Sequence, residues 1–103
     1  MPTPELAFVA LGSNVGDRAA HLESAREHLA KLSNTSIVAE SSIEETKPLG
    51  PVGQGNFLNQ MLLLRTDLSA QEVLHAGLEA ERHAGRVRKT RWGSRTLDVD
   101  VVR

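Results

Sequence analysis

Cysteine is absent from the 103 residues, so the chain can form neither a disulfide nor a thiolate metal site. No apolar run approaches the length of a membrane-spanning helix. The first residues lack the basic and apolar segments of a secretory signal. The chain also has no large excess of positive or negative charge, since its formal net charge is −1. This balance argues against nucleic acid as a partner. These absences leave one small cytoplasmic domain, with a modest core, as the expectation.

Hydrophobic periodicity predicts six elements of secondary structure. In chain order they are a strand at 6–11, a helix at 18–32 capped by Asp17, an outer strand at 36–45, a central strand at 57–65, a helix that opens with a capping box at 69–72 and ends at Gly85, and a strand at 96–102. The wholly apolar run at 6–11 is typical of a strand buried on both faces. On the second helix, the spacing predicts a buried side formed by Val73, Leu74, Gly77, Leu78 and Ala84.

The element order β-α-β-β-α-β is that of an α+β, ferredoxin-like domain, in which two helices cover one face of an antiparallel sheet. All 103 residues fit this single domain. Many unrelated activities occur on this fold, so function has to be argued from particular residues.

The segment from Gly85 to Asp100 carries the clearest chemistry. It packs five cationic side chains into a glycine-bounded loop and then sends Asp98 and Asp100 along a strand. Residues two apart on a strand share a face, so these two carboxylates lie side by side and need a cation between them. Mg²⁺ suits that demand, and upstream arginines suit the phosphates that it would carry. The alternative is a solvated basic loop beside a polar strand face. The adjacency of loop and aspartates favours metal-assisted chemistry on a nucleotide.

Three ordered motifs resemble one enzyme family. The segment 85–100 reads G-R-V-R-K-T-R-W-G-S-R-T-L-D-V-D, and 10–14, 46–51 and 56–59 read A-L-G-S-N, T-K-P-L-G-P and N-F-L-N. These resemble the motifs of the 6-hydroxymethyl-7,8-dihydropterin pyrophosphokinases of folate biosynthesis, whose last motif is approximately G-R-x-R-x-x-R-W-G-P-R-x-L-D-x-D. Ser94 stands where that family usually has proline. The fold of the family agrees with the element order predicted above.

The resemblance implies transfer of pyrophosphate from ATP to the hydroxymethyl group of the reduced pterin, with release of AMP. Asp98 and Asp100 would hold two Mg²⁺ ions, and Arg86 and Arg95 would act on phosphate oxygens. These four residues are the implied catalytic set. The implied ATP-binding residues are Glu81, Arg86, Arg88, Trp92 and Arg95, with Trp92 sealing a loop that closes over the nucleotide. For Glu81, a solvated helix position is an equal alternative.

The middle motif would supply the pterin site. The implied residues are Thr46, Lys47, Leu49, Phe57 and Asn59. An asparagine both donates and accepts, as the heteroatom edge of a pterin requires. An aromatic ring suits a flat ligand. Phe57 could instead be a core residue at the start of a strand. Gly12, Ser13 and Asn14 in the first motif would shape the floor of the site, although Asn14 could equally be a turn residue.

The chain departs from the family pattern after Asp100, because it ends at Arg103 where members of the family usually have a further C-terminal third. Activity below that of longer relatives and association into a homodimer are therefore expected. Two other interpretations remain open. One is a nucleotide- or pterin-binding module without turnover. The other is a ferredoxin-like interaction domain whose basic loop binds acidic partners, although such a domain has no need of paired aspartates.

Overall fold

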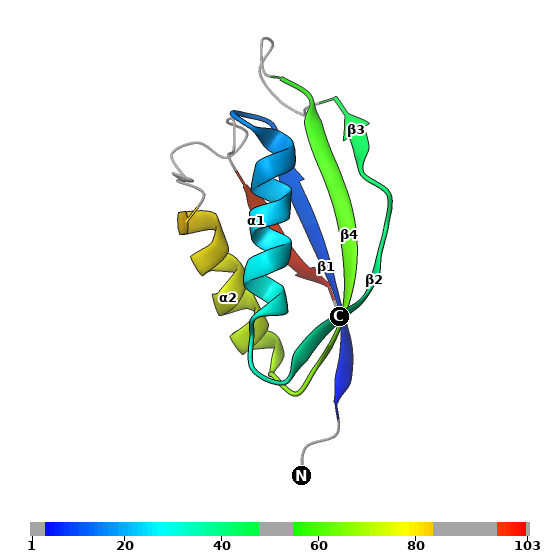
Figure 1. The fold of residues 1–103 in the computed structure, drawn as a ribbon, viewed down its shortest axis with the longest axis vertical. Helices are drawn as coiled ribbons and strands as arrows, with labels where there is room; N and C mark the ends of the chain where they lie inside the picture. The colour runs from blue at the N-terminus through cyan, green and yellow to red at the C-terminus, as the bar shows by residue number, and fades with distance from the viewer. Residues whose placement is uncertain (1–3, 48–54, 84–96, 103) are drawn as a thin grey trace.

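The computed structural model describes residues 4–47, 55–83 and 97–102 (Figure 1). The elements are β1 (Glu5–Ser13), α1 (Arg18–Ala30), β2 (Thr35–Glu40), β3 (Glu44–Thr46), β4 (Phe57–Thr66), α2 (Ala70–His83) and β5 (Asp98–Val102). Each predicted element is present, except that the outer strand is divided into β2 and β3. The predicted end of the second helix at Gly85 lies outside the described residues.

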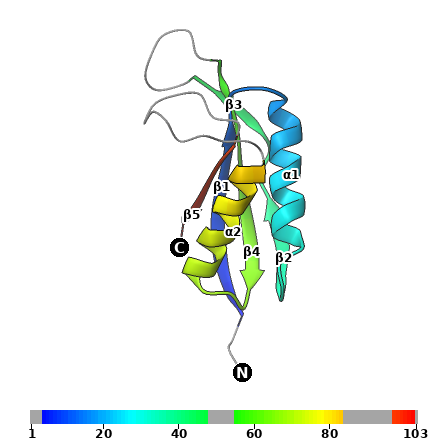
Figure 2. The same cartoon turned by 90° about the vertical axis from the view of Figure 1, so that its left-hand side faces the viewer.

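The sheet has the connections of a split β-α-β fold. Its strands follow the order β2-β4-β1-β5, and every described pair is antiparallel, with β3 pairing with β4 as well. Helix α1 joins β1 to β2 across β4, and α2 joins β4 to β5 across β1. Both helices lie on one face of the sheet (Figure 2), where one hydrophobic core unites residues of the helices and of β1, β4 and β5. The predicted α+β, ferredoxin-like arrangement is confirmed.

Over residues 6–11, strand β1 is buried mainly on one face. Ala7, Val9 and Leu11 are 0–2% exposed beneath the helices, whereas Leu6 and Phe8 are 60% and 48% exposed on the other side. The prediction that this strand is buried on both faces is therefore wrong. Its alternate apolar residues belong to a second face of the sheet, which we call the open face, and neither described helix covers it.

The break between β2 and β3 corrects the prediction of one outer strand at 36–45. The register against β4 already shifts between Ile37 and Ala39, which is the sign of a bulge. Beyond Glu40 the chain is held by Ser41, whose backbone N–H donates to the Met61 carbonyl and whose Oγ accepts from the Met61 N–H, both at 2.8 Å. The side chain of Gln60 also donates to the Ser41 carbonyl at 2.9 Å. Side-chain hydrogen bonds thus replace the regular ladder here.

Helix α2 opens with the predicted capping box. The Ser69 N–H donates to Glu72 Oε1 at 2.9 Å, and the Glu72 N–H donates to Ser69 Oγ at 3.1 Å. Its buried side consists of small residues and one acid, namely Val73, Ala76, Gly77, Ala80 and Glu81. The predicted burial of Leu74 and Leu78 is wrong, because they are 44% and 38% exposed. A stripe of small side chains lets the helix lie closer to the sheet than leucines would allow.

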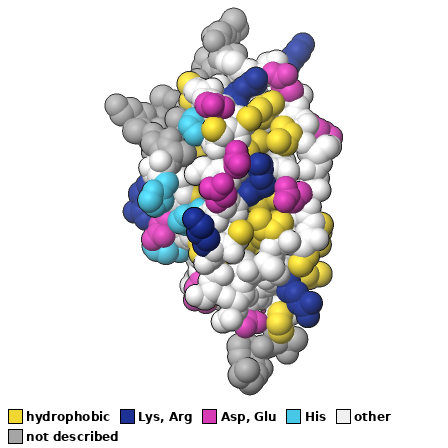
Figure 3. All heavy atoms as spheres, in the orientation of Figure 1, with side chains coloured by type: hydrophobic (Ala, Val, Ile, Leu, Met, Phe, Trp, Pro, Cys, Tyr) yellow, Lys and Arg dark blue, Asp and Glu magenta, His cyan; other side chains and the backbone are white. Residues whose placement is uncertain are grey.

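Helix α1 begins as predicted at Asp17, whose carboxylate accepts the Ala20 N–H at 3.1 Å. It buries Leu22, Ala25 and Leu29 against the sheet. Acidic and basic side chains are interspersed over the face that carries the helices (Figure 3), as in a solvated surface. Within the described ranges, neither helix has the length and apolar character to cross a membrane.

Candidate active site

Gly12 stands at the centre of a group of polar and aromatic side chains on the open face. It pairs with Asn59 on β4 and with Asp98 on β5, so three neighbouring strands meet at this position. A Cβ placed on Gly12 would lie 3.4 Å from Asn59 Oδ1, 3.5 Å from Phe57 Cδ1 and 3.9 Å from Asp98 Cβ. We call Gly12, Phe57, Asn59 and Asp98 the Gly12 cluster. It brings together residues from all three sequence motifs.

The two aspartates lie on the same face, as their spacing predicts. Asp98 pairs with Gly12 and Asp100 with Ala10 on β1, while Val99 between them is 2% exposed in the core. Asp98 is half-buried and Asp100 is exposed. The described residues include no group of three or more His, Asp or Glu side chains arranged for a metal. A donor set of two carboxylates on an accessible face fits Mg²⁺, which takes its remaining ligands from water and substrate phosphates.

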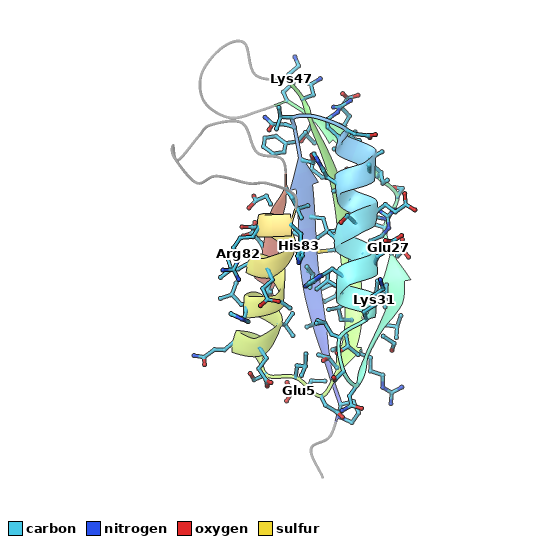
Figure 4. All side chains as sticks on the ribbon, turned by 60° about the vertical axis from the view of Figure 1, so that its left-hand side comes forward. Glu5, Glu27, Lys31, Lys47, Arg82 and His83 are labelled. Atoms are coloured by element: carbon cyan, nitrogen blue, oxygen red, sulfur yellow. The ribbon has the colours of Figure 1, made fainter. Side chains whose placement is uncertain are left out.

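The middle motif supplies the other side of the Gly12 cluster. Asn59 donates from Nδ2 to Thr46 Oγ1 at 2.6 Å, which turns its Oδ1 toward Gly12. Phe57 is half-buried and does not belong to the hydrophobic core, so the alternative that it is a core residue is not supported. Lys47 is exposed and lies at the opposite end of the molecule from Glu5 (Figure 4). The sequence predicted this amide and aromatic pair for a flat, heteroatom-edged ligand.

Two side chains secure the start of β4: Arg18, which the sequence did not indicate, and Asn14, which was expected at the floor of the site or in a turn. Arg18, at the first turn of α1, donates to the Asn56 carbonyl at 2.8 Å and to Glu45 Oε2 at 3.0 Å. Asn14, which is 5% exposed, donates from Nδ2 to the Gly55 carbonyl at 3.3 Å. All three bonds span long sequence separations, and no local pattern signals them. They hold the residues just before Phe57 against Asn14, which follows β1, and against the first turn of α1.

Glu81 lies on the buried side of α2. It directly precedes Arg82 and His83, which Figure 4 labels at the end of the helix. It is 3% exposed, so the alternative of a solvated helix glutamate is wrong. Its Oε2 accepts the backbone N–H of Val99 at 2.8 Å. The signal for such burial was its position four residues after Gly77, on the inward stripe of the helix. Its assignment to ATP binding stays a prediction.

The remaining predicted site residues are outside the part of the chain that the structure describes. They are Leu49 of the pterin set and Arg86, Arg88, Trp92 and Arg95 of the nucleotide set. Of the predicted residues that the structure describes, strand pairing brings five to one end of the open face, namely Thr46, Phe57, Asn59, Asp98 and Asp100. Lys47 directly follows Thr46 in the chain, whereas Glu81 lies on the buried side of α2.

Fold and cluster together define a small α+β domain with a carboxylate pair beside an amide and an aromatic ring on an open sheet face. The family model described as 7,8-dihydro-6-hydroxymethylpterin-pyrophosphokinase (HPPK) matches residues 8–103. The match takes in every residue of the Gly12 cluster. The chain belongs to this family.

Bacterial relatives agree with the family model. The 2-amino-4-hydroxy-6-hydroxymethyldihydropteridine pyrophosphokinase of Haemophilus influenzae is 41% identical over 96 residues, which cover 93% of this chain and 60% of that protein. The protein of the same name from Bacillus subtilis is 39% identical over 97 residues, covering 94% of this chain and 58% of its own length. The chain therefore spans about three fifths of the length of these two relatives.

A solved structure supports the fold independently. The chain resembles part of the Bacillus subtilis YXEP protein, described as a dinuclear metal binding peptidase from the M20 family, with a TM-score of 0.56 and 12% identity. The similarity covers 96% of this chain and 26% of that one. At this identity it shows a shared fold alone.

Proposed function

We propose that the chain contributes to the transfer of a pyrophosphoryl group from ATP to the hydroxymethyl group of 6-hydroxymethyl-7,8-dihydropterin. In this reaction the pterin hydroxyl oxygen bonds to the β-phosphorus, the bond from that phosphorus to the α,β-bridging oxygen breaks, AMP leaves and the hydroxyl proton is lost. The observation that carries the proposal is the Gly12 cluster, in which Asp98 on β5 and Asn59 and Phe57 on β4 flank Gly12 from opposite sides. The carboxylate proposed for the nucleotide side, Asp98, thereby lies across Gly12 from the proposed pterin-recognition residues, Asn59 and Phe57.

On the nucleotide side, Asp98 and Asp100 would hold two Mg²⁺ ions. When bound, the ions supply charge neutralisation for the triphosphate. The aspartates' part is to present two oxygens from one rigid strand, whose register against β1 fixes their separation from Gly12. Arg86 and Arg95 would contact phosphate oxygens with their planar guanidinium groups, and Glu81, Arg88 and Trp92 complete the proposed nucleotide set. The residues' contribution is positioning and electrostatic stabilisation.

On the pterin side, Phe57 would stack on the ring and Asn59 would bind its heteroatom edge. Because Asn59 Nδ2 is engaged by Thr46, its Oδ1 is the atom oriented toward Gly12 as an acceptor. Pterin rings carry N–H donors along that edge, which an amide oxygen complements. Lys47 and Leu49 would complete the contacts. A bare glycine backbone between these groups and Asp98 leaves room for the hydroxymethyl arm to approach the metal side.

A matched pair of substitutions at Gly12 tests the proposal. A Cβ at this position would have its nearest neighbours at 3.4 to 3.9 Å, which are ordinary van der Waals distances, so Gly12→Ala is tolerated there. The branched side chain of Gly12→Val, in contrast, fills the space above the backbone. Calorimetric titration with 6-hydroxymethylpterin and with a Mg²⁺ complex of a non-hydrolysable ATP analogue measures both sites. We expect Gly12→Val to abolish pterin binding and Gly12→Ala to weaken it only modestly.

The unmodified chain provides the decisive outcome. Binding of both ligands together with AMP release supports the enzyme. Binding without AMP release supports a module that lacks turnover. Binding of neither ligand would contradict the proposal and favour an interaction domain.

The cytoplasmic location, the absence of nucleic acid and membrane partners, and the homodimer also stay predictions. Self-association is suggested by apolar side chains on the open face, where Phe8 and Val102 are 48% and 50% exposed. Light scattering measures the mass, and a monomer at all concentrations would contradict the dimer.

A further inference from the structure

Two different contacts from helix α2 fall on the same residue of β5, Val99. Gly77 lies so close that a Cβ on it would be 2.8 Å from Val99 Cγ1. One helical turn later, the Glu81 carboxylate accepts the Val99 N–H at 2.8 Å. Positions four apart stand on the same side of a helix, so shape and hydrogen bonding act together on one strand residue.

Val99 lies between the two aspartates in the sequence. Val99 points into the core and is 2% exposed, while Asp98 and Asp100 point to the open face. β5 ends the described strand order beside β1, so a Val99 N–H that donates to Glu81 is not used in the ladder with β1. A rotation or slip of β5 would move both carboxylates at once, since successive side chains alternate between faces.

We infer that Glu81 is a positioning residue, which fixes the two metal-binding carboxylates by holding the backbone between them. The glutamate is 3% exposed on the covered side, and its hydrogen bond to the Val99 N–H connects it to the strand that carries both open-face carboxylates. A charged acceptor makes this a stronger bond than a neutral one, and its length of 2.8 Å fits that class. The inference rests on the proposed function for its metal, and gives Glu81 a part in the nucleotide site that does not require direct contact with ATP.

Two substitutions of Glu81 distinguish a positioning role from a direct effect of its charge. Glu81→Gln keeps a carbonyl oxygen that can accept the Val99 N–H, and Glu81→Met fills similar space without an acceptor. Thr66→Val is the matched control for a lost buried hydrogen bond. Thr66 is 1% exposed and accepts the Leu68 N–H at 3.0 Å, and it lies at the far end of β4 from Asn59.

Two measurements apply to each variant. The first is hydrogen exchange of the Val99 amide in metal-free protein. The second is the affinity for Mn²⁺ in the presence of β,γ-methylene-ATP, from water proton relaxation. We expect Glu81→Met to lose protection at Val99 and to bind Mn²⁺ about 10- to 100-fold more weakly, as when the supporting partner of a metal ligand is removed. Glu81→Gln should restore both properties, and Thr66→Val should change neither.

Distinct results overturn the inference and the proposed function. If Glu81→Gln binds Mn²⁺ as poorly as Glu81→Met while keeping Val99 protected, the charge itself acts and the positioning role is wrong. If Glu81→Met retains protection and affinity, it is equally wrong. If the unmodified chain binds no Mn²⁺, the proposed function fails, and carboxyl carbon shifts of Asp98 and Asp100 in Glu81→Met still report whether the carboxylates move.

A second variant covers the case in which Glu81→Met does not fold. Gly77→Ala leaves Glu81 in place, but the Cβ that it introduces at position 77 is forced against the stiff side chain of Val99. We expect a smaller loss of Mn²⁺ affinity in the same direction. Unchanged Mn²⁺ affinity together with unchanged Val99 exchange would contradict the inference.

Discussion

The two faces of the sheet are made from the same strands, yet they carry different chemistry. On the covered face, Val9, Leu62 and Val99 are 0–2% exposed and pack beneath the helices. On the open face, the residue before Val99 is Asp98, which lies beside Gly12. Because side chains alternate along a strand, every core residue is followed by one that the core does not constrain. Those unconstrained positions are where this chain keeps its candidate site.

The covered face also determines the geometry of the open one. Leu11, Val99 and their neighbours fix the register among β1, β4 and β5, and the register sets which open-face residues meet. A one-residue slip of β5 would carry its aspartates into the core. Packing on one side therefore specifies the site on the other, although no core residue belongs to the site.

The largest effect should be on the free energy of unfolding, when a core residue and its neighbour on the open face are each replaced by alanine. Leu62 is 0% exposed in the core, and Met61 beside it is 39% exposed on the open face. Leu62→Ala should lower the free energy of unfolding by about 2–5 kcal/mol through lost burial and a cavity. Met61→Ala should lower the free energy of unfolding by much less, as a surface substitution does. Urea unfolding measures both, and equal losses would contradict the difference between the faces.

The second prediction concerns the carboxylate pair. Asp98→Ala should leave stability nearly unchanged, since Asp98 is on the open face, but should weaken Mg²⁺-dependent binding of an ATP analogue by about 100-fold or more, above the range for supporting residues. Titration calorimetry with and without a chelator checks this. Glu44, another open-face acid that pairs with Asn59, supplies the control, and Glu44→Ala should leave the metal dependence intact. Equal affinity with and without metal in the unmodified chain would refute the prediction.

A smaller effect is expected at Phe57. Its ring would provide stacking worth about 0.5–1.5 kcal/mol, so Phe57→Leu should weaken pterin binding by up to about tenfold. Nucleotide affinity should not change. Fluorescence titration with the pterin measures the first quantity. If pterin affinity is retained while the unfolding free energy falls, Phe57 is a structural residue and the pterin assignment is wrong.

The smallest effect is the pH response of the α2 capping box. Hydrogen bonds from the Ser69 backbone N–H, and secondly from its side chain, hold the pKa of Glu72 below its ordinary value of 4.5. A lowered folded-state pKa means that the stabilisation is fully present above pH 4.5 and is lost as the pH falls through the folded-state pKa. Glu72→Gln should therefore lower the thermal midpoint slightly at neutral pH, and less in acid. Thermal unfolding across that range measures it, and a pH-independent difference would count against this origin.

Local patterns predicted the elements, their order and the two helix starts, because capping and periodicity act within a few residues. They did not predict which alternate residues of β1 are covered, since an apolar run looks alike on both faces. The burial of Leu74 and Leu78 was wrongly predicted for a related reason. The close approach of α2 to Val99 requires small residues such as Gly77 on the buried side, and the leucine spacing of the helix contains no information about that contact.

For the candidate site, the spacing of Asp98 and Asp100 was sufficient to predict a shared face, and the motifs indicated Phe57 and Asn59. Their meeting at Gly12 depends on strand register, which is a tertiary property. The bonds of Arg18 and Asn14 to the start of β4 have the same origin. The burial of Glu81 follows from the docking of α2 on β5, which a single helix pattern does not contain.

The central claim is that the metal side and the pterin side adjoin at Gly12 on the open face. Mn²⁺ is a paramagnetic substitute for Mg²⁺ that broadens the NMR signals of nearby nuclei. Titrating it into the isotopically labelled chain with β,γ-methylene-ATP tests the claim directly. We predict that the backbone signals of Gly12, Ala10 and Asn59 broaden first, while those of Leu22 and Leu29 on the covered side persist. Broadening centred on α1 or α2, with Gly12 and Asn59 unaffected, would contradict the account.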